Sequence, residues 1–229
     1  MILKYPRTYH LPSSPGLASD DKRLPSTRVF EGRRVIVTEK MDGEGTSMTR
    51  EATWPRSPDG RSHPSRNWIK AHHARKAFDI PDGWRISGEY MYARHSLPYT
   101  QERGNALPSF FLGFGVWDDS NRLLGWDRTV EVLQDLGFAM VPVLYDGPYS
   151  DRVIAEIAAS IDPERQEGFV VRDADEMDYP GGGGDGRFFE ALAKWVRPRH
   201  HQTGAGWASA WRDEAQFRNE LQAGLPTAP

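Results

Sequence analysis

The chain has 229 residues, of which 27% are charged and 38% hydrophobic, with a formal net charge of -3 and no cysteine. This length can bury a complete core, and the absence of cysteine excludes disulfides and thiolate chemistry. The small net charge gives no overall attraction to nucleic acid or membrane, so any polyanion site must be a local patch. The N-terminal residues lack the apolar stretch of a secretory signal, and no segment approaches the ~20 apolar residues of a membrane span. We therefore expect a cytoplasmic protein without membrane partners.

The first thirty residues are rich in Pro and Ser and predict an extended N-terminal arm, residues 1–30, with little regular structure. Beyond the arm, short runs rich in β-branched and aromatic residues predict strands, because each run is bounded by Gly, Pro, Asp or Asn. These runs cover residues 33–40, 83–92, 108–118, 139–147, 167–173 and 190–197.

Four helices are predicted between and after these strands. The first begins near Ser65 as its N-cap, the second opens at Asp127 and ends at Gly137, and the third opens at Ser150. The fourth covers residues 207–222 near the C-terminus. Because the helices interrupt the strands irregularly, the pattern predicts an α+β fold with mainly antiparallel sheets flanked by helices.

The first predicted strand leads into the stretch "VIVTEKMDGEGT", which contains a lysine in a chain where only six of the 29 Lys and Arg residues are lysines. Strand alternation places Lys40 on the opposite face from Val37 and Glu39. A lysine beside a tight turn could serve as a nucleophile if burial, guanidinium groups or a metal lowered its pKa. Taken alone, a surface lysine that ends an edge strand is the commoner explanation for Lys40.

Later segments change the interpretation of this lysine. The Lys-Met-Asp-Gly sequence at Lys40 resembles the nucleotidyl-acceptor motif of covalent nucleotidyltransferases, the superfamily of ATP-dependent DNA ligases, RNA ligases and mRNA capping enzymes. The later motifs of that superfamily are matched in order by "SGEYMY" around Glu89, "FGVWD" ending at Asp118, "EGFVVR" from Glu167 and "AKWVR" around Lys194. Five ordered matches imply a nucleotidyltransferase domain of the ATP-grasp-like ligase adenylation type.

Within the superfamily, the chain is most similar to ATP-dependent RNA ligases. "VTEKMDGEGT" resembles the acceptor motif of nick-sealing phage RNA ligases, and Arg56-Ser57 resembles an Arg-Ser pair that follows it there. "GEYMYARHSLPY" and "KWVRPRHHQT" resemble small bacterial and phage proteins classed with RNA ligases. The resemblance extends from about Lys4 to Thr203.

The resemblance implies catalytic roles for three matched residues. Lys40 would attack the α-phosphorus of ATP, release pyrophosphate and hold AMP as a phosphoramidate. Glu167 would bind a divalent metal, and Lys194 would contact the α-phosphate. Carboxylate ligands without cysteine suit Mg²⁺ or Mn²⁺ better than zinc, and phosphoryl transfer needs such cations at the phosphates.

The resemblance also implies a nucleotide-binding set around the lysine. Arg56 would bind phosphate through its planar guanidinium group, and Glu89 would accept a hydrogen bond from a ribose hydroxyl. Phe114 or Trp117 would stack on the adenine, because a single strand cannot easily direct both rings at it. The expected nucleotide-binding residues are Glu39, Lys40, Arg56, Glu89, Phe114, Trp117, Glu167 and Lys194.

Two features depart from the family pattern. The last motif usually carries a second lysine two residues after the first, but this chain has Val196 there and Arg197 on the opposite strand face. The chain also ends soon after Lys194, so we expect a single nucleotidyltransferase domain over 1–229 with a helical tail over 204–229. No separate oligonucleotide-binding or helical domain is expected. Candidate phosphate-backbone contacts are Arg94, His95, Arg197, Arg199, His200 and His201.

The expected function is that of an ATP-dependent RNA ligase. It would adenylate itself, transfer AMP to a 5′-phosphate and join that end to a 3′-hydroxyl, with ATP and RNA or RNA-containing nucleic acid as partners. Two alternatives stay open: a related enzyme that uses GTP or passes AMP to another acceptor, and a nucleic-acid-binding relative without catalysis. RNA, DNA and hybrid substrates all fit the sequence.

Overall fold

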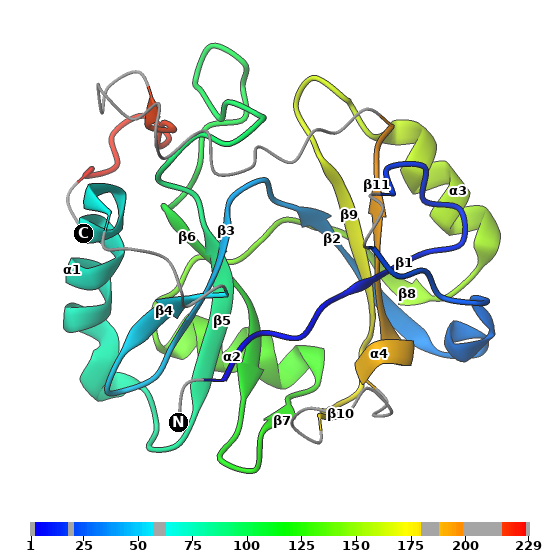
Figure 1. Ribbon diagram of the computed structural model, residues 1–229, viewed down its shortest axis with the longest axis horizontal. Helices are drawn as coiled ribbons and strands as arrows, with labels where there is room; N and C mark the ends of the chain where they lie inside the picture. The colour runs from blue at the N-terminus through cyan, green and yellow to red at the C-terminus, as the bar shows by residue number, and fades with distance from the viewer. Residues whose placement is uncertain (1–2, 18–20, 57–62, 180–187, 199–216, 228–229) are drawn as a thin grey trace.

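The computed structural model describes residues 3–17, 21–56, 63–179, 188–198 and 217–227. Two mainly antiparallel sheets lie side by side, with helices packed against their outer faces (Figure 1). The α+β class predicted from the sequence is confirmed. Within the described ranges, we find no helix with the length and apolar character needed to cross a membrane.

The five-stranded sheet has the order β1-β11-β9-β2-β8, and all its pairs are antiparallel except β1 with β11. Its outer face carries Val35, Val37 and Phe169, which share a core with Ile154 of the helix α3, Asp151–Ser160. The strands are β1 Tyr9–His10, β2 Arg34–Lys40, β8 Val143–Pro148, β9 Gly168–Asp173 and β11 Leu192–Val196.

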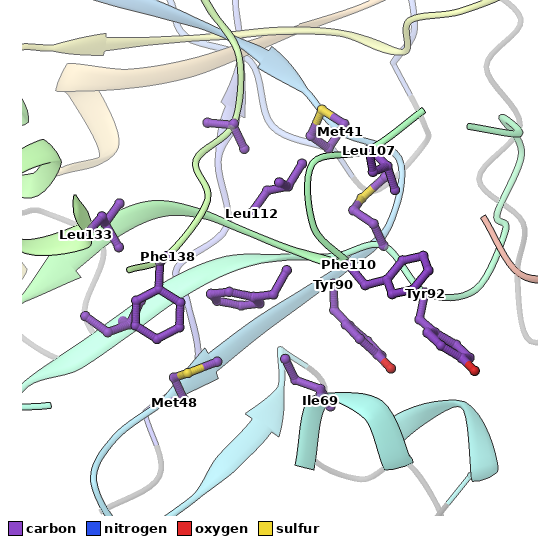
Figure 2. Close-up of a cluster of buried hydrophobic side chains, with 14 of the residues drawn as sticks. Met41, Met48, Ile69, Tyr90, Tyr92, Leu107, Phe110, Leu112, Leu133 and Phe138 are labelled. Carbon is purple, nitrogen blue, oxygen red and sulfur yellow. The ribbon is translucent and has the colours of Figure 1, made fainter. Parts of the chain in front are cut away.

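The six-stranded sheet has the order β10-β7-β6-β5-β3-β4 and is antiparallel throughout. Figure 2 shows its largest core, where Ile69 and Leu133 enter from helices and meet Met48, Tyr90 and Leu112 from the strands. The elements are β3 Glu44–Met48, β4 Thr53–Pro55, α1 Asn67–Lys76, β5 Arg85–Tyr90, β6 Phe111–Trp117, β7 Arg122–Leu123, α2 Trp126–Asp135 and β10 Met177–Asp178.

Short helices complete the described structure. The helix α4, Phe188–Ala191, leads directly into β11. Three single turns of 3-10 helix occupy Arg28–Phe30, Pro64–Arg66 and Ala77–Asp79. The last two flank α1, so this helical segment has 3-10 geometry at both ends.

Most predicted elements are found in the structure. Each of the six predicted strand runs contains a strand. Helix α3 has Ser150 as its N-cap, whose hydroxyl accepts a hydrogen bond from the Val153 N–H, and α2 ends before Gly137, which has φ 65°. The predicted N-cap at Ser65 is wrong. His63 caps the preceding 3-10 turn instead, accepting a hydrogen bond from the Ser65 N–H.

The two chain ends compare differently with the predictions. The described part of the N-terminal arm has little regular structure, as predicted, and contributes only the two-residue parallel edge strand β1 and a three-residue 3-10 turn. The predicted fourth helix, residues 207–222, lies largely outside the described residues. In its described part Phe217 is helical, and isolated bridges follow from Arg218 to Ala93 and from Leu221 to Leu107. Pairing with the body of the protein replaces the helical pattern from Arg218 onward.

Candidate active site

A cavity of about 370 Å³ opens between the two sheets. Strands β2, β9 and β11 contribute one wall, while β3, β5 and β6 contribute the other. The volume falls within the usual range for small-molecule sites. Seven of the eight nucleotide-binding residues predicted from the sequence line it: Glu39, Lys40, Arg56, Glu89, Phe114, Glu167 and Lys194.

The centre of the cavity is an ion pair between Lys40 and Glu167. Lys40 ends β2 opposite Gly168 of β9, so the antiparallel register brings the residue before Gly168 next to the amine. The Lys40 Nζ donates to Glu167 Oε2 at 2.5 Å, with side chains 24% and 2% exposed. Gly168 has φ 155°, and a Cβ there would meet the Trp195 carbonyl oxygen at 2.0 Å, so this approach requires glycine.

The carboxylates around Lys40 determine its charge state. Burial lowers the pKa of Lys40, but the carboxylates of Glu167 and Glu89 outweigh burial, and the net pKa lies above its ordinary value. The condition of a lowered pKa, under which the lysine could act as a nucleophile, is not met in the nucleotide-free protein. Lys40 is held as an ammonium ion and must lose a proton before it can act as a nucleophile.

Glu89 faces the same space from β5, opposite Gly45 of β3. Burial raises the pKa of Glu89 to about 8; Lys40 opposes this shift, and Glu167 adds to it. At neutral pH the side chain is therefore mostly an uncharged carboxylic acid, which can donate a hydrogen bond as well as accept one.

The turn after the lysine is fixed by Asp42, to which the sequence assigned no role. Its Oδ2 accepts hydrogen bonds from the Ser96 N–H at 2.8 Å, the Ser96 hydroxyl at 2.6 Å and the Leu97 N–H at 2.7 Å. The Asp42 N–H donates to the Tyr99 hydroxyl at 3.0 Å. These bonds connect the turn after β2 to the loop that carries Ser96, Leu97 and Tyr99, and they fix the backbone beside Lys40.

The arm supplies groups that sequence reasoning missed. Residues 5–8 and Asp21 line the cavity, and Asp21 Oδ1 accepts a hydrogen bond from Lys194 Nζ at 3.1 Å. Burial lowers the pKa of Lys194, and Asp21 opposes that shift. An aspartate in a Pro- and Ser-rich segment belongs to no periodic pattern or motif, so Asp21 could not be identified as a site residue from sequence.

Of the two candidate stacking rings, Phe114 lines the cavity and Trp117 does not. Phe114 lines the cavity and contacts Tyr5 edge to face, with ring centroids 5.1 Å apart. Trp117 is fully buried and stacks on Phe188 at 5.7 Å in a separate core. Trp117 does not line the cavity, although its ring also contacts Tyr5 edge to face at 5.9 Å. The pairing of β5 with β6 shifts register at Phe114, so strand alternation does not separate the two rings there.

The remaining predicted contacts are scattered. Glu39 lines the cavity and accepts a hydrogen bond from the Gln166 amide at 3.0 Å, while burial raises its pKa. Arg94 donates instead to the Arg218 carbonyl at 3.1 Å, and Arg197 gives its backbone N–H to the Glu167 carbonyl. Neither of these two arginines lines the cavity.

Of the other basic candidates, His95 lines the cavity. Three more, Arg199, His200 and His201, lie outside the described residues, and so does Ser57 of the predicted Arg-Ser pair.

The sequence model of the RNA ligase family matches residues 33–196, which includes every motif residue named above from Lys40 to Lys194. The chain belongs to the RNA ligase family. A search of curated proteins found no match.

Solved structures of RNA ligases have the same fold as this family member. A Naegleria gruberi RNA ligase mutant with ATP and Mn aligns at a TM-score of 0.54 and 15% identity, over 85% of this chain and 56% of that one. An archaeal ATP-dependent RNA ligase aligns at 0.54 and 20%, over 85% and 48%. A putative ATP-dependent DNA ligase from Aquifex aeolicus aligns at 0.55 and 16%, over 85% and 50%. The chain spans about half the length of these proteins.

The carboxylates of this RNA ligase family member are compatible with a divalent cation. In the described part of the chain, no group of three or more His, Asp or Glu side chains is arranged to hold a metal ion by itself. Glu167 and Glu89 nevertheless line one cavity, and their mutual repulsion contributes to the raised pKa of Glu89. Hard oxygen donors of this kind suit Mg²⁺ or Mn²⁺ with the remaining positions filled by phosphate and water.

Proposed function

We propose that this protein is an ATP-dependent polynucleotide ligase, acting on RNA, that carries AMP covalently on Lys40. The supporting observation is the placement of the Lys40 amine in a cavity that is also lined by Lys194, by several carboxyl groups, including Glu89 and Glu167, and by the ring of Phe114. Nucleotidyl transfer needs a nucleophile, cations for the phosphates and a surface for the base, and these groups supply all three.

ATP would bind with its base against Phe114 and its phosphates toward the cations. Lys194 and Arg56 both line the cavity and would neutralise phosphate oxygens. Glu39 and Glu89 would hydrogen-bond to the base or ribose, with Glu89 able to donate because its pKa is about 8. Phe114 is held by its edge-to-face contact with Tyr5, so the stacking surface is in place before the nucleotide arrives.

Self-adenylation begins when Lys40 loses its extra proton. The Nζ lone pair then forms a bond to the α-phosphorus, the bond from that phosphorus to the oxygen bridging the β-phosphate breaks, and pyrophosphate leaves. The attacking nitrogen releases a second proton to become the phosphoramidate. A divalent cation bound at Glu167 would withdraw carboxylate charge from Lys40 and offset the charge of the phosphates.

Joining would follow in two further transfers. An oxygen of an RNA 5′-phosphate attacks the phosphorus of lysyl-AMP, and the P–N bond breaks to return Lys40 to its amine form. A 3′-hydroxyl then attacks the activated 5′-phosphorus and releases AMP. We place these steps, like adenylation, on a single nucleotidyltransferase domain that comprises both sheets.

Mass spectrometry after incubation with ATP and Mg²⁺ tests the proposal. The wild-type protein should gain one AMP, located on Lys40 by peptide mapping. The Lys40→Ala variant should gain none, whereas the matched control Lys70→Ala, an exposed lysine of α1, should label normally. Labelling from GTP but not ATP would indicate a capping-type enzyme. A wild-type protein that takes no label from either nucleotide would indicate a binding protein.

A further inference from the structure

The N-terminal arm forms a bonded network that starts and ends on β11. We propose that Asp21 is a positioning residue for Lys194, held in place by Ser14 and His10, and that it keeps the Lys194 ammonium group directed into the nucleotide cavity. The role of Lys194 in binding phosphate rests on the proposed function. The network itself rests on the geometry below.

The network is a continuous series of hydrogen bonds. The Val196 N–H donates to Ser14 Oγ at 3.0 Å, Ser14 Oγ lies 2.8 Å from His10 Nδ1, and His10 Nε2 lies 2.9 Å from Asp21 Oδ2. The second oxygen of Asp21 accepts from Lys194 Nζ at 3.1 Å. Lys194 and Val196 are two residues apart on β11, so the series leaves the strand at the Val196 backbone and returns to it at the Lys194 side chain.

The directions of these bonds fix the proton positions. An ionised Asp21 can only accept, so His10 must donate from Nε2. Burial and the nearby Lys194 lower the pKa of His10, which favours a neutral imidazole whose Nδ1 accepts from the Ser14 hydroxyl. Ser14 Oγ is then free to accept from Val196. Every polar group is satisfied with one negative charge on Asp21 and one positive charge on Lys194.

Because Lys194 is largely buried, its positive charge depends on the Asp21 carboxylate. His10 and Ser14 are fully buried, and the side chains of Asp21 and Lys194 are 10% and 11% exposed. The groups that act on Lys194 are Asp21, Lys40 and Glu167, with the neutral His10 behind Asp21. Burial and Lys40 favour the uncharged amine, and Asp21 is the only one of these groups bonded directly to it.

Backbone contacts hold the arm against β11. The Leu11 N–H donates to the Lys194 carbonyl at 2.8 Å, and the Gly16 N–H donates to the Val196 carbonyl at 3.0 Å. A Cβ on Gly16 would meet the Arg197 carbonyl oxygen at 2.4 Å, so the close approach requires glycine. The segment after Asp21 is held by β1 in turn, because the His10 N–H donates to the Lys22 carbonyl at 2.7 Å and the Leu24 N–H donates to the His10 carbonyl at 2.8 Å.

The first test measures the free-amine fraction of Lys194 in the absence of nucleotide. Trace acetylation at neutral pH, quantified by peptide mass spectrometry, measures the free-amine fraction of each lysine. In Asp21→Asn, loss of the carboxylate should make Lys194 roughly tenfold more reactive, which corresponds to a pKa lower by about one unit. Asp82→Asn, a matched exposed carboxylate, should leave Lys194 unchanged. Equal reactivity of Lys194 in wild type and Asp21→Asn would overturn the proposal, whether or not the protein proves to be a ligase.

The second test asks whether Asp21 acts through Lys194. Lys40 adenylation should be about tenfold slower in Asp21→Asn, but Asp21→Asn should have little further effect in a Lys194→Met background. Asp21→Glu should recover part of the rate, because it restores the charge. Additive losses in the double variant would assign Asp21 a merely structural role and overturn the proposal. If wild type is never adenylated, the proposed function fails, while the acetylation result still decides the network.

Discussion

Lys40 and Glu167 lie 127 positions apart in the sequence and form a hydrogen-bonded ion pair across the junction of β2 and β9. The pair holds the candidate nucleophile as an ammonium ion until substrate arrives. An ammonium ion is not a nucleophile, so the ion pair keeps Lys40 unreactive. Its activation then depends on a ligand or cation that displaces Glu167 from the amine.

The nucleotide-free reactivity of Lys40 should depend on Glu167. Glu167→Gln removes the charge that, with Glu89, raises the pKa of Lys40, so the pKa should fall and the free-amine fraction should rise. Trace acetylation of Lys40 at neutral pH should increase several-fold, and Glu102→Gln serves as an exposed control. In wild type, the same labelling should rise with pH by about tenfold per unit below the pKa. Slower labelling in Glu167→Gln would contradict this account of the ion pair.

Glu89 should make stability depend on pH near neutrality. Its folded-state pKa of about 8 lies above the ordinary 4.5, so its contribution to stability is fully present below pH 4.5 and is lost as the pH rises through about 8. Glu89→Gln lacks this dependence. The melting temperature of Glu89→Gln minus that of wild type should therefore increase steadily across this window in calorimetry. A difference that is constant with pH would show that Glu89 is ionised in the folded protein.

Phe114 and Trp117 should separate binding from stability. Phe114→Ala removes a ring from the cavity wall, so ATP affinity should fall by about tenfold, in line with a lost stacking contact. Trp117→Ala empties a fully buried site and should lower the free energy of unfolding by about 3–5 kcal/mol. Calorimetric titration with ATP and urea unfolding measure the two effects. If Phe114→Ala and Trp117→Ala lowered ATP affinity equally, Phe114 would not be the ring that stacks on the adenine.

Two glycines of the lysine motif should respond differently to alanine. A Cβ on Gly43 would meet the Tyr90 carbonyl oxygen at 2.7 Å and the Met91 sulfur at 2.6 Å, so Gly43→Ala should displace the turn and greatly slow adenylation. The nearest atom to a Cβ on Gly45 is 3.7 Å away, which makes Gly45→Ala a matched control with nearly normal adenylation. Adenylation rates and melting temperatures of both variants check the prediction. Similar rates would show that the close approach at Gly43 is dispensable.

The strands and the order of the motifs could be predicted because they are local patterns. β-Branched and aromatic runs predicted β2, β5, β6, β8, β9 and β11, but not the shorter strands β1, β3, β4, β7 and β10. The predicted strands also indicated the cavity wall that carries Lys40, Glu89 and Glu167. Strand alternation could not decide between Phe114 and Trp117, because the register of β6 shifts at Phe114 and both rings contact Tyr5. Which ring reaches the cavity depends on packing against Tyr5 and Phe188 from distant segments, which no local pattern reports.

The charge states and the arm could not be predicted from the sequence. The pKa of Lys40 depends on the distance to two carboxylates that only tertiary packing defines, so the sequence left the direction of its shift open. The departure of Val196 from the family pattern has a structural counterpart, since Ser14 and Gly16 of the arm pack where a longer side chain would compete for space. Composition predicted that the arm is extended, but it did not predict which residues of the two sheets the arm contacts.

The arm also tethers the two halves of the molecule. Its Leu3 and Tyr5 carbonyls accept hydrogen bonds from Trp54 and Arg56 beside the six-stranded sheet, while Tyr9 and His10 pair with β11 in the five-stranded sheet (Figure 1). A chain of so few residues between two anchors is short and of nearly fixed span. The width of the nucleotide cavity is therefore limited by the length of this tether, and an insertion between Tyr5 and Tyr9 would act as a spacer that lets the halves separate.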